Sequence, residues 1–569
     1  MSRTCFVGAC VLFTALQAEL RAVELIDRPV EGRQYATLTF RFVQNLHYEN
    51  PFDLVTNRVE LRIVQPDSSR LILSFFYDGK DKNEVEQWEA RFSPLQAGNY
   101  SFSVEIDSKI QNQFEIPVKP ASGTKLGGLR LSSQLGEFAF QSGEAFRGIG
   151  LNVCWAQDYE YYFKKMQKAG INVTRIWMCP WSLSFEWKET GLGRYNLRSA
   201  RRFDSILALA EKYGIYVILC IDFHGIAPKG VGYFKEDRWL ENPYNKLNGG
   251  PCMNEADLFT NADAKSYFQK KYKYIISRFG SSSNIAAWEF INEADLMAGT
   301  SRDVNRWHEE MGEYIRSIDV HHRLISASST RSYMEKLVDA FRSPALDFVM
   351  YHDYNSLDIA PHFIDFFDAA NDYYQKPVIL GEFGIEFRSA ERTMEYDPED
   401  IGLHNGIWSG LFSETPVIPL SWWWDSYVDR KNLWPGYASL SRFADSLHIG
   451  PDHLVFKALN AGNSQTSPQK QVACMVRCIV SGSDCALWFK NPEYAWSLVY
   501  EGKKPGELEA FTQTVPDLAQ GRYSIAWYNP QSGEFTGEPQ EAAVKHDGIL
   551  SLSVPSFSKD LACIIQRLP

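Results

Sequence analysis

The stretch Asn284-Ile-Ala-Ala-Trp-Glu-Phe-Ile-Asn-Glu293 decides the fold that this chain is expected to adopt. Its apolar run predicts a buried strand that ends in an amide next to a carboxylate. A second apolar run, Pro377-Val-Ile-Leu-Gly-Glu382, also stops on a glutamate. Acidic residues often follow strands, so either glutamate alone would mean little. The pair, together with the number of predicted strands around it, is the strongest signal in the chain, because the C-terminal ends of barrel strands meet at one face.

The sequence around these two runs alternates between apolar strands and amphipathic helices. Helices are predicted at 159–169, 197–213 and 262–279 from their hydrophobic periodicity. The predicted strands are Phe146–Val153, Ile171–Met178, Ile215–Ile221, Ile285–Ile291, Arg323–Ala327, Asp347–Tyr351, Val378–Leu380 and Val417–Trp424. This alternation predicts an α/β fold, a (β/α)8 TIM barrel over residues 121–452. A doubly wound sheet is the alternative, but no glycine-rich phosphate loop follows the first strand.

Both flanks of the barrel are predicted to be all-β. Residues 23–120 contain short alternating runs separated by turn residues, as in an immunoglobulin-like β-sandwich. Residues 453–569 alternate again and predict a C-terminal β-domain without helices, in which Ser497 to Tyr500 is one strand. A hairpin over 129–132 and 138–141 is expected to close the bottom of the barrel.

The N-terminus has the pattern of a secretory signal peptide over residues 1–22. Arg3 precedes an apolar run from Cys5 to Leu16, and Ala18 and Ala22 are candidate cleavage positions. An anchor helix is the less favoured alternative, because the run is too short to span a bilayer. We therefore expect a secreted or periplasmic protein, and no other segment has the apolar length of a membrane span.

Composition narrows the classes of partner. The chain has 569 residues and a formal charge of -12, which argues against nucleic acid as a partner. The cysteines form no CxxC pair, and no histidine is placed so as to suggest a zinc knuckle, so we expect neither a metal site nor a cofactor. Cys474, Cys478 and Cys485 leave room for one disulfide. The oligomeric state is not determined by the sequence.

Two glutamates at barrel strand ends are what glycoside hydrolysis with retention requires. One carboxyl group starts protonated and the other starts ionised, about 5 Å apart. We assign Glu293 as acid/base and Glu382 as nucleophile, with Asn292 donating to the sugar 2-hydroxyl. The expected partner is a polysaccharide or oligosaccharide substrate. The competing class is a carbohydrate-binding or scaffolding protein without activity on the same barrel.

The two strand ends resemble those of the clan A glycoside hydrolases, closest to family 5 of the cellulase and mannanase type. The resemblance covers roughly residues 127 to 450. It implies that Arg175, in Asn172-Val-Thr-Arg175-Ile-Trp177, braces the nucleophile. It also implies that His224, in Asp222-Phe-His224-Gly225, lines the site. The flanking domains resemble β-domains attached to hydrolases of this kind.

The last two strands of the resemblance complete the expected site. In His352-Asp-Tyr354, the tyrosine is implied to hydrogen-bond the nucleophile while the histidine shares its face. In Ser421-Trp-Trp-Trp-Asp425, one tryptophan is implied to form the floor under the scissile sugar. Strand alternation places Trp422 and Trp424 on one face and Trp423 on the other, which favours Trp422.

Each motif also has a structural interpretation. His224 can be a core histidine bonded to backbone, and Arg175 can form an ordinary salt bridge. Glu289 and Glu386 lie near the catalytic pair in sequence, and a structural role is the default for both.

Overall fold

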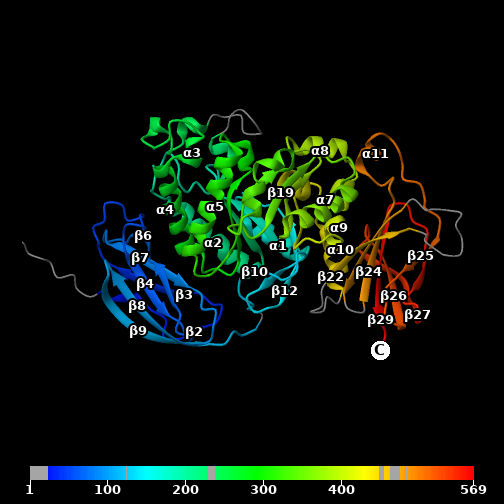
Figure 1. Cartoon of the computed structure of the whole chain (residues 1–569), viewed down its shortest axis with the longest axis horizontal. Helices are drawn as coiled ribbons and strands as arrows, with labels where there is room; N and C mark the ends of the chain where they lie inside the picture. The colour runs from blue at the N-terminus through cyan, green and yellow to red at the C-terminus, as the bar shows by residue number, and fades with distance from the viewer. Residues whose placement is uncertain (1–22, 124, 228–237, 448–453, 462–473, 482–483) are drawn as a thin grey trace, which may run out of the picture.

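A computed structural model describes residues 23–123, 125–227, 238–447, 454–461, 474–481 and 484–569 of the chain. The predicted signal peptide, residues 1–22, lies outside the described residues. Figure 1 shows a central barrel with one β-domain on each side. The predicted (β/α)8 barrel with flanking β-domains is confirmed. The domain boundaries given above remain predictions.

The barrel is a sheet of nine strand segments in the order β17-β16-β15-β14-β13-β21-β20-β19-β18. The segments are β13 (Gly148–Leu151), β14 (Val173–Trp177), β15 (Tyr216–Phe223), β16 (Ile285–Asn292), β17 (Leu324–Ser326), β18 (Ser328–Thr330), β19 (Val349–Tyr354), β20 (Val378–Gly384) and β21 (Val417–Ser421). Only Ala327 separates β17 from β18, so these two segments are the halves of one barrel strand. Because β17 pairs with β16 and β18 pairs with β19, the broken strand closes the circle.

Helices connect successive strands on the outside of the barrel. They are α1 (Tyr159–Lys168), α2 (Leu197–Tyr213), α3 (Asp257–Thr260), α4 (Ala262–Phe279), α5 (Ser301–Ile318), α6 (Val338–Arg342), α7 (Ile359–Tyr374), α8 (Ala390–Tyr396), α9 (Ile401–Leu411) and α10 (Trp434–Asp445). The ends of α2 show why the predicted helices form where they do. Asn196 caps its first backbone N–H groups, and Gly214 ends it with a left-handed φ of 68°.

The predicted hairpin lies at the N-terminal end of the barrel. Strands β10 (Leu129–Leu131), β11 (Phe138–Phe140) and β12 (Ala145–Phe146) form a small antiparallel sheet. Its apolar side chains form one buried cluster with residues from the starts of the barrel strands, such as Val173, Ile218 and Val417. The far end of the barrel is therefore left for the site.

The N-terminal β-domain is a sandwich of two mostly antiparallel sheets, and it packs against the barrel. One sheet has the order β1-β3-β7-β6 and the other β2-β9-β8-β4-β5. Their strands are β1 (Leu25–Asp27), β2 (Gly32–Arg33), β3 (Leu38–Val43), β4 (Val59–Val64), β5 (Arg70–Ser74), β6 (Phe76–Lys80), β7 (Glu86–Phe92), β8 (Gly98–Ile106) and β9 (Lys109–Lys119). Arg91 of β7 and Arg278 of α4 both bind Asp204 of α2, with N–O distances of 2.6 Å.

The C-terminal β-domain consists of a six-stranded sheet, β22-β23-β24-β29-β26-β27, and a pair, β25-β28. The strands are β22 (Leu454–Asn460), β23 (Met475–Ser481), β24 (Asp484–Lys490), β25 (Phe511–Val515), β26 (Gly521–Asn529), β27 (Glu534–Val544), β28 (Leu550–Val554) and β29 (Asp560–Arg567). Ring contacts of Trp408 and Phe443 with Tyr528 join it to helices α9 and α10 of the barrel.

Three sequence predictions were wrong in detail. The strand predicted at Val417–Trp424 ends at Ser421, because Trp423 takes a left-handed φ of 57° and a π-helix begins at Trp424. The segment Ser497–Tyr500 belongs to a short helix, α11 (Trp496–Tyr500), rather than to a strand. All eight cysteines in the described part of the chain are free thiols, so none of them forms the disulfide considered above.

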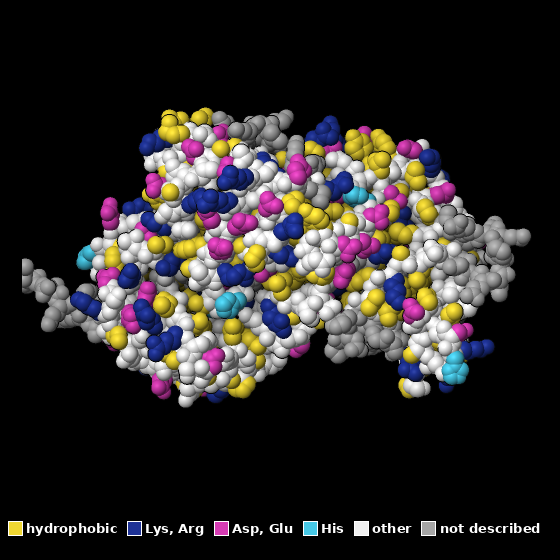
Figure 2. Space-filling view, viewed as in Figure 1, with side chains coloured by type: hydrophobic (Ala, Val, Ile, Leu, Met, Phe, Trp, Pro, Cys, Tyr) yellow, Lys and Arg dark blue, Asp and Glu magenta, His cyan; other side chains and the backbone are white. Residues whose placement is uncertain are grey.

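The surface charge and the length of the helices bear on possible partners of the protein. Figure 2 shows acidic and basic side chains interspersed over the visible face of the molecule. Within the described residues, none of the helices combines the length and the apolar character needed to cross a bilayer.

We predict that Asp204→Ala lowers the free energy of unfolding by about 3 kcal/mol. The substitution removes a carboxylate that neutralises the buried guanidinium of Arg278. Urea unfolding measures this change. The control is Glu211→Ala on the same helix, whose ion pair with Lys125 is exposed, and we expect a change within about 0.5 kcal/mol. Equal effects of the two substitutions would contradict the prediction.

Candidate active site

Glu382 lies on β20 near its C-terminal end and is bonded by two donors. Nη1 of Arg175 donates to one carboxylate oxygen at 2.7 Å, and the hydroxyl of Tyr354 donates to the other at 2.7 Å. The Glu382 side chain is almost completely buried. The predicted roles of Arg175 and Tyr354 therefore have the geometry that they require, because both side chains fix the orientation of this carboxylate.

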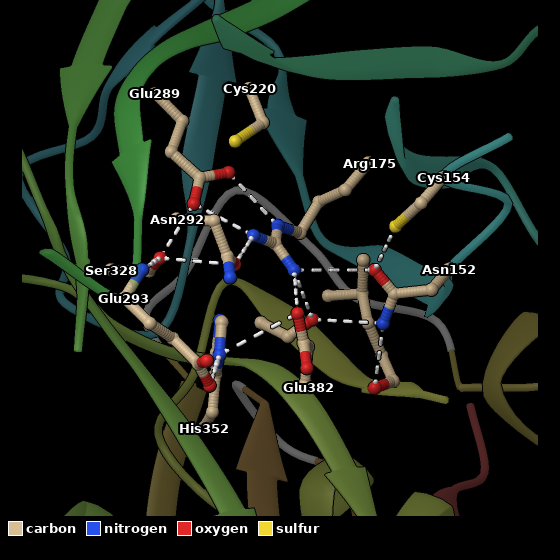
Figure 3. Close-up of polar contacts among 12 residues, drawn as sticks. Asn152, Cys154, Arg175, Cys220, Glu289, Asn292, Glu293, Ser328, His352 and Glu382 are labelled. Atoms are coloured by element: carbon tan, nitrogen blue, oxygen red, sulfur yellow. Dashed lines mark hydrogen bonds and ion pairs between the residues drawn. The ribbon is translucent and has the colours of Figure 1, made fainter. Parts of the chain in front are cut away.

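Arg175 contacts the side chains of Glu289, Glu382, Asn292 and Asn152, as Figure 3 shows. Its guanidinium is fully buried and binds Glu289 of β16 through Nε at 2.9 Å and Nη2 at 2.7 Å. Nη2 also donates to Oδ1 of Asn292 at 2.6 Å. A buried guanidinium needs compensating charge, and here two carboxylates supply it. Both interpretations of Arg175 thus apply together, since the salt bridge is part of the site.

Glu293 directly follows β16 and points at two histidines. Its Oε1 lies 2.7 Å from Nδ1 of His352, and its Oε2 lies 3.4 Å from Nδ1 of His224. Its backbone has a left-handed φ of 50°, a conformation that costs a non-glycine residue of order 1 kcal/mol. The backbone N–H donates to Oγ of Ser328 at 3.0 Å, which supports this turn.

His352 lies between the two carboxyl groups. Burial lowers its pKa to about 4, partly offset by the charge of Glu382. The ring is therefore neutral, and its Nδ1 faces Glu293 at 2.7 Å and Glu382 at 3.5 Å. Its Nε2 has no hydrogen-bond partner among the described residues.

The two carboxyl groups differ in what stabilises their charge. Burial raises the pKa of Glu293 and of Glu382 above the ordinary value. Glu382, however, bonds directly to the Arg175 guanidinium and to a phenol, whereas the partners of Glu293 are two histidines whose own pKa values burial lowers. These partners favour the ionised form of Glu382 more strongly than that of Glu293.

Glu293 and Glu382 line a cavity of about 530 Å³ at the C-terminal end of the barrel. Asn292, His224 and His352 line it together with both glutamates. Since Arg175 and Ser328 occupy the amide oxygen of Asn292, its NH2 group is left as the donor. Six tryptophans form much of the remaining wall: Trp155, Trp177, Trp181, Trp422, Trp423 and Trp424.

The three consecutive tryptophans all line this cavity, which corrects the alternation argument. Beyond Ser421 the backbone is no longer extended, so Trp423 does not point to the opposite side. Its Nε1 donates to the carbonyl oxygen of Glu386 at 2.8 Å. Trp422 and Trp424 are both in place for sugar contact, and which of them stacks on the sugar stays a prediction.

A second cavity of about 410 Å³ adjoins the first and shares Trp155, Trp181, Trp424 and Asp425 with it. Its other side is formed by α1 and the segment before it, including Tyr161 and Tyr162. Trp155 makes edge contacts with Trp181 at 5.4 Å and Trp424 at 5.0 Å between ring centroids. The two cavities thus share an aromatic wall.

The same site also contains a cluster of potential metal ligands. Among the residues that the structure describes, Glu293, His352 and Glu382 form the group whose ligand atoms all lie within 4.8 Å of one another. A cation there would have to displace the Arg175 guanidinium from Glu382 or lie next to its charge. The residues therefore fit a proton-transfer site better than a metal site.

Several contributors were missed by the sequence analysis or given a lesser role. Glu289 was assigned a structural role, yet it compensates Arg175 and accepts from Ser328 Oγ at 2.6 Å. A glutamate within a buried apolar strand requires a cationic partner, which is the signal that the sequence offered. Ser328, Trp155 and Arg331 had no comparable signal. Ser328 begins the second half of the broken strand, and Trp155 and Arg331 lie just beyond the ends of β13 and β18. Glu386 binds Arg388 and does not line the cavity, as its structural assignment predicted.

Comparison with known proteins agrees with this geometry. Residues 140–404 match the model described as cellulase (glycosyl hydrolase family 5). The barrel is therefore similar to the clan A glycoside hydrolases, close to family 5. The resemblance noted in the sequence is thereby confirmed. Residues 31–107, in the N-terminal sandwich, match a domain of unknown function, DUF5060.

Two curated relatives of this chain are mannanases by name. Mannan endo-1,4-beta-mannosidase 4 of Oryza sativa subsp. japonica is 25% identical over 261 residues, or 39% of this chain and 54% of the relative. Mannan endo-1,4-beta-mannosidase F of Aspergillus fumigatus is 22% identical over 286 residues, or 44% of this chain and 59% of the relative. The chain thus spans little more than half the length of these relatives.

A solved structure extends the similarity to the flanking domains. A Bacteroides vulgatus ATCC 8482 protein, provisionally assigned to the glycoside hydrolases, has a TM-score of 0.65 at 15% identity. The match covers 95% of this chain and 100% of that one. At this identity the similarity shows the fold alone, with a β-domain on each side of the barrel.

We predict that Tyr354→Phe moves the acidic limb of the pH dependence of kcat/KM to higher pH. The substitution removes a donor that stabilises the ionised form of Glu382, so the pKa of that carboxyl rises. The profile is measured with an aryl glycoside. Tyr351→Phe is the control, because its hydroxyl bonds Tyr374 and not Glu382. An unshifted acidic limb in Tyr354→Phe would contradict the assignment.

Proposed function

We propose that this glycoside hydrolase is an exported retaining β-glycosidase that cleaves a polysaccharide of the β-mannan or β-glucan type. The separation of the two carboxyl groups supports retention. Their nearest ligand oxygens lie within 4.8 Å, close to the roughly 5 to 5.5 Å of retaining enzymes and well short of the roughly 6.5 to 9.5 Å of inverting ones. The names of the curated relatives favour mannan within this class.

In the first step the ionised Glu382 attacks the anomeric carbon while Glu293 protonates the departing glycosidic oxygen. Arg175 and Tyr354 keep the attacking carboxylate oriented. In the second step Glu293 takes a proton from water, which releases the sugar from the glycosyl-enzyme. In this proposal the NH2 group of Asn292 donates to the sugar 2-hydroxyl, a hydrogen bond that strengthens in the transition state.

The competing interpretation was a barrel that binds glycans without cleaving them. Both carboxyl groups are present, and each has its supporting partners within hydrogen-bond distance. A binding-only barrel has no need for an arginine and a tyrosine that orient one carboxylate. The arrangement therefore favours catalysis.

The positions of the two glutamates and of the second cavity indicate how the glycan chain is oriented in the site. Glu293 protonates the leaving oxygen, so the departing part of the glycan lies on the side of β16 and β18. The second cavity lies on the opposite side, near the loops after β13, β14 and β21. We infer that it receives sugar units of the part retained in the glycosyl-enzyme, and that its tyrosines and tryptophans stack on them.

The carboxylate roles predict different azide products. Glu293→Ala with azide yields a β-glycosyl azide, because azide needs no base to attack the glycosyl-enzyme. Glu382→Ala with azide yields an α-glycosyl azide, because azide then takes the place of the missing carboxylate. Both variants lose activity without azide, by about 100-fold or more. NMR of the products identifies the anomers.

Glu386→Gln is the matched control, since Glu386 is a buried glutamate near the same strand end that does not line the cavity. We expect it to retain activity per folded molecule and to form no azide product. Wild-type protein that binds mannans and glucans but cleaves none of them would overturn the proposed function.

The second cavity predicts a dependence on substrate length. With aryl glycosides of increasing glycone length, kcat/KM should rise once a sugar reaches Tyr161. Tyr161→Ala should reduce that gain by about 3- to 10-fold on the longer substrates. Tyr373→Ala, which removes an exposed tyrosine from α7, is the control. A gain that Tyr161→Ala leaves intact would exclude this cavity from substrate binding.

A further inference from the structure

The connection between β19 and α7, residues 355–358, begins directly after Tyr354. Asn355 lines the main cavity and has a left-handed φ of 65°. The position of the Tyr354 hydroxyl against Glu382 therefore depends on how this short connection is held. A displacement of the connection changes the hydrogen bond to the nucleophile.

Two side chains of the C-terminal β-domain bind this connection. Nε1 of Trp496, in α11, donates to the carbonyl oxygen of Ser356 at 2.8 Å, and both residues are buried. Nζ of Lys490, at the end of β24, lies 3.3 Å from a carboxylate oxygen of Asp358. Lys490 is 1% exposed, so its charge depends on this partner. Figure 1 shows α11 next to α8 at the barrel.

The barrel binds the same connection from its other side. Oγ of Ser356 donates to Asp353 at 2.8 Å, and the second oxygen of Asp353 accepts from His362 at 2.7 Å. Asp353 also forms an ion pair with Arg331 at 2.7 Å, and Arg331 lines the cavity. The connection is thus clamped between a buried barrel carboxylate and the C-terminal domain.

The C-terminal domain is fixed firmly enough to hold that position. Asp560 of β29 is buried and accepts from His404 of α9 at 2.7 Å and from Trp488 at 2.9 Å. Nδ2 of Asn405 in α9 donates to the carbonyl oxygen of Tyr494 at 2.9 Å, two residues before Trp496. These buried polar contacts set the distance between α11 and the barrel. A separate binding module on a flexible linker would have no such contacts.

We propose that the C-terminal β-domain is a positioning element of the active site, with Trp496 as the residue that holds the Tyr354 connection in place. The kinetic readout of this inference rests on the proposed glycosidase function. Trp496 contacts neither Glu382 nor the cavity, so it acts through Ser356 and Tyr354. The domain is in this respect a component of the catalytic unit.

The test uses Trp496→Phe in the full-length chain, which keeps an aromatic ring and removes the N–H donor. Trp527→Phe is the matched control, because Trp527 is buried in the same domain and its Nε1 has no hydrogen-bond partner in the described structure. We expect Trp496→Phe to lower kcat by about 10-fold with little change in KM. We also expect the acidic limb of kcat/KM to move to higher pH, in the direction expected for Tyr354→Phe.

Hydrogen–deuterium exchange at residues 353–358 provides a readout that needs no activity. Faster exchange there in Trp496→Phe, and not in Trp527→Phe, is the expected result. A lower Tm with unchanged kcat, pH profile and exchange would overturn the proposal and leave Trp496 a packing residue. Wild-type protein without glycosidase activity would refute the proposed function instead, and the exchange data would still decide whether Trp496 holds the connection.

Discussion

The buried guanidinium of Arg175 is the constraint on which the site depends. A desolvated cation is unfavourable unless carboxylates surround it, and Arg175 binds Glu289 and Glu382 at once. The same guanidinium orients the amide of Asn292. Three strands, β14, β16 and β20, are thereby linked at one depth in the barrel. The nucleophile cannot move without breaking the charge balance of this network.

Glu293, the proposed acid/base group, has different partners. Glu293 sits in a left-handed conformation after β16, and its neighbours are histidines that burial keeps neutral. A neutral environment favours the protonated acid, whereas a guanidinium favours the ionised nucleophile. The division of labour between two chemically identical side chains thus comes from their partners.

The flanking domains bear differently on this arrangement. The N-terminal sandwich packs on the outer side of α2 and α4 through the ion pairs around Asp204. The C-terminal domain reaches the connection after β19, next to a residue that bonds the nucleophile. The ion pairs of the N-terminal sandwich therefore stabilise the barrel. The contact of the C-terminal domain instead affects the geometry of the active site.

The sequence by itself determined the barrel, its flanking β-domains and the two glutamates, because hydrophobic periodicity and polar residues at strand ends are local signals. The roles expected of Arg175 and Tyr354 came from the resemblance of their motifs to a known family. Only the tertiary structure decided three further points. Glu289 pairs with the same guanidinium as Glu382, Trp423 lines the cavity, and Trp496 donates to the carbonyl oxygen of Ser356. Each of these depends on backbone turns or on contacts between distant segments, and no local pattern encodes them.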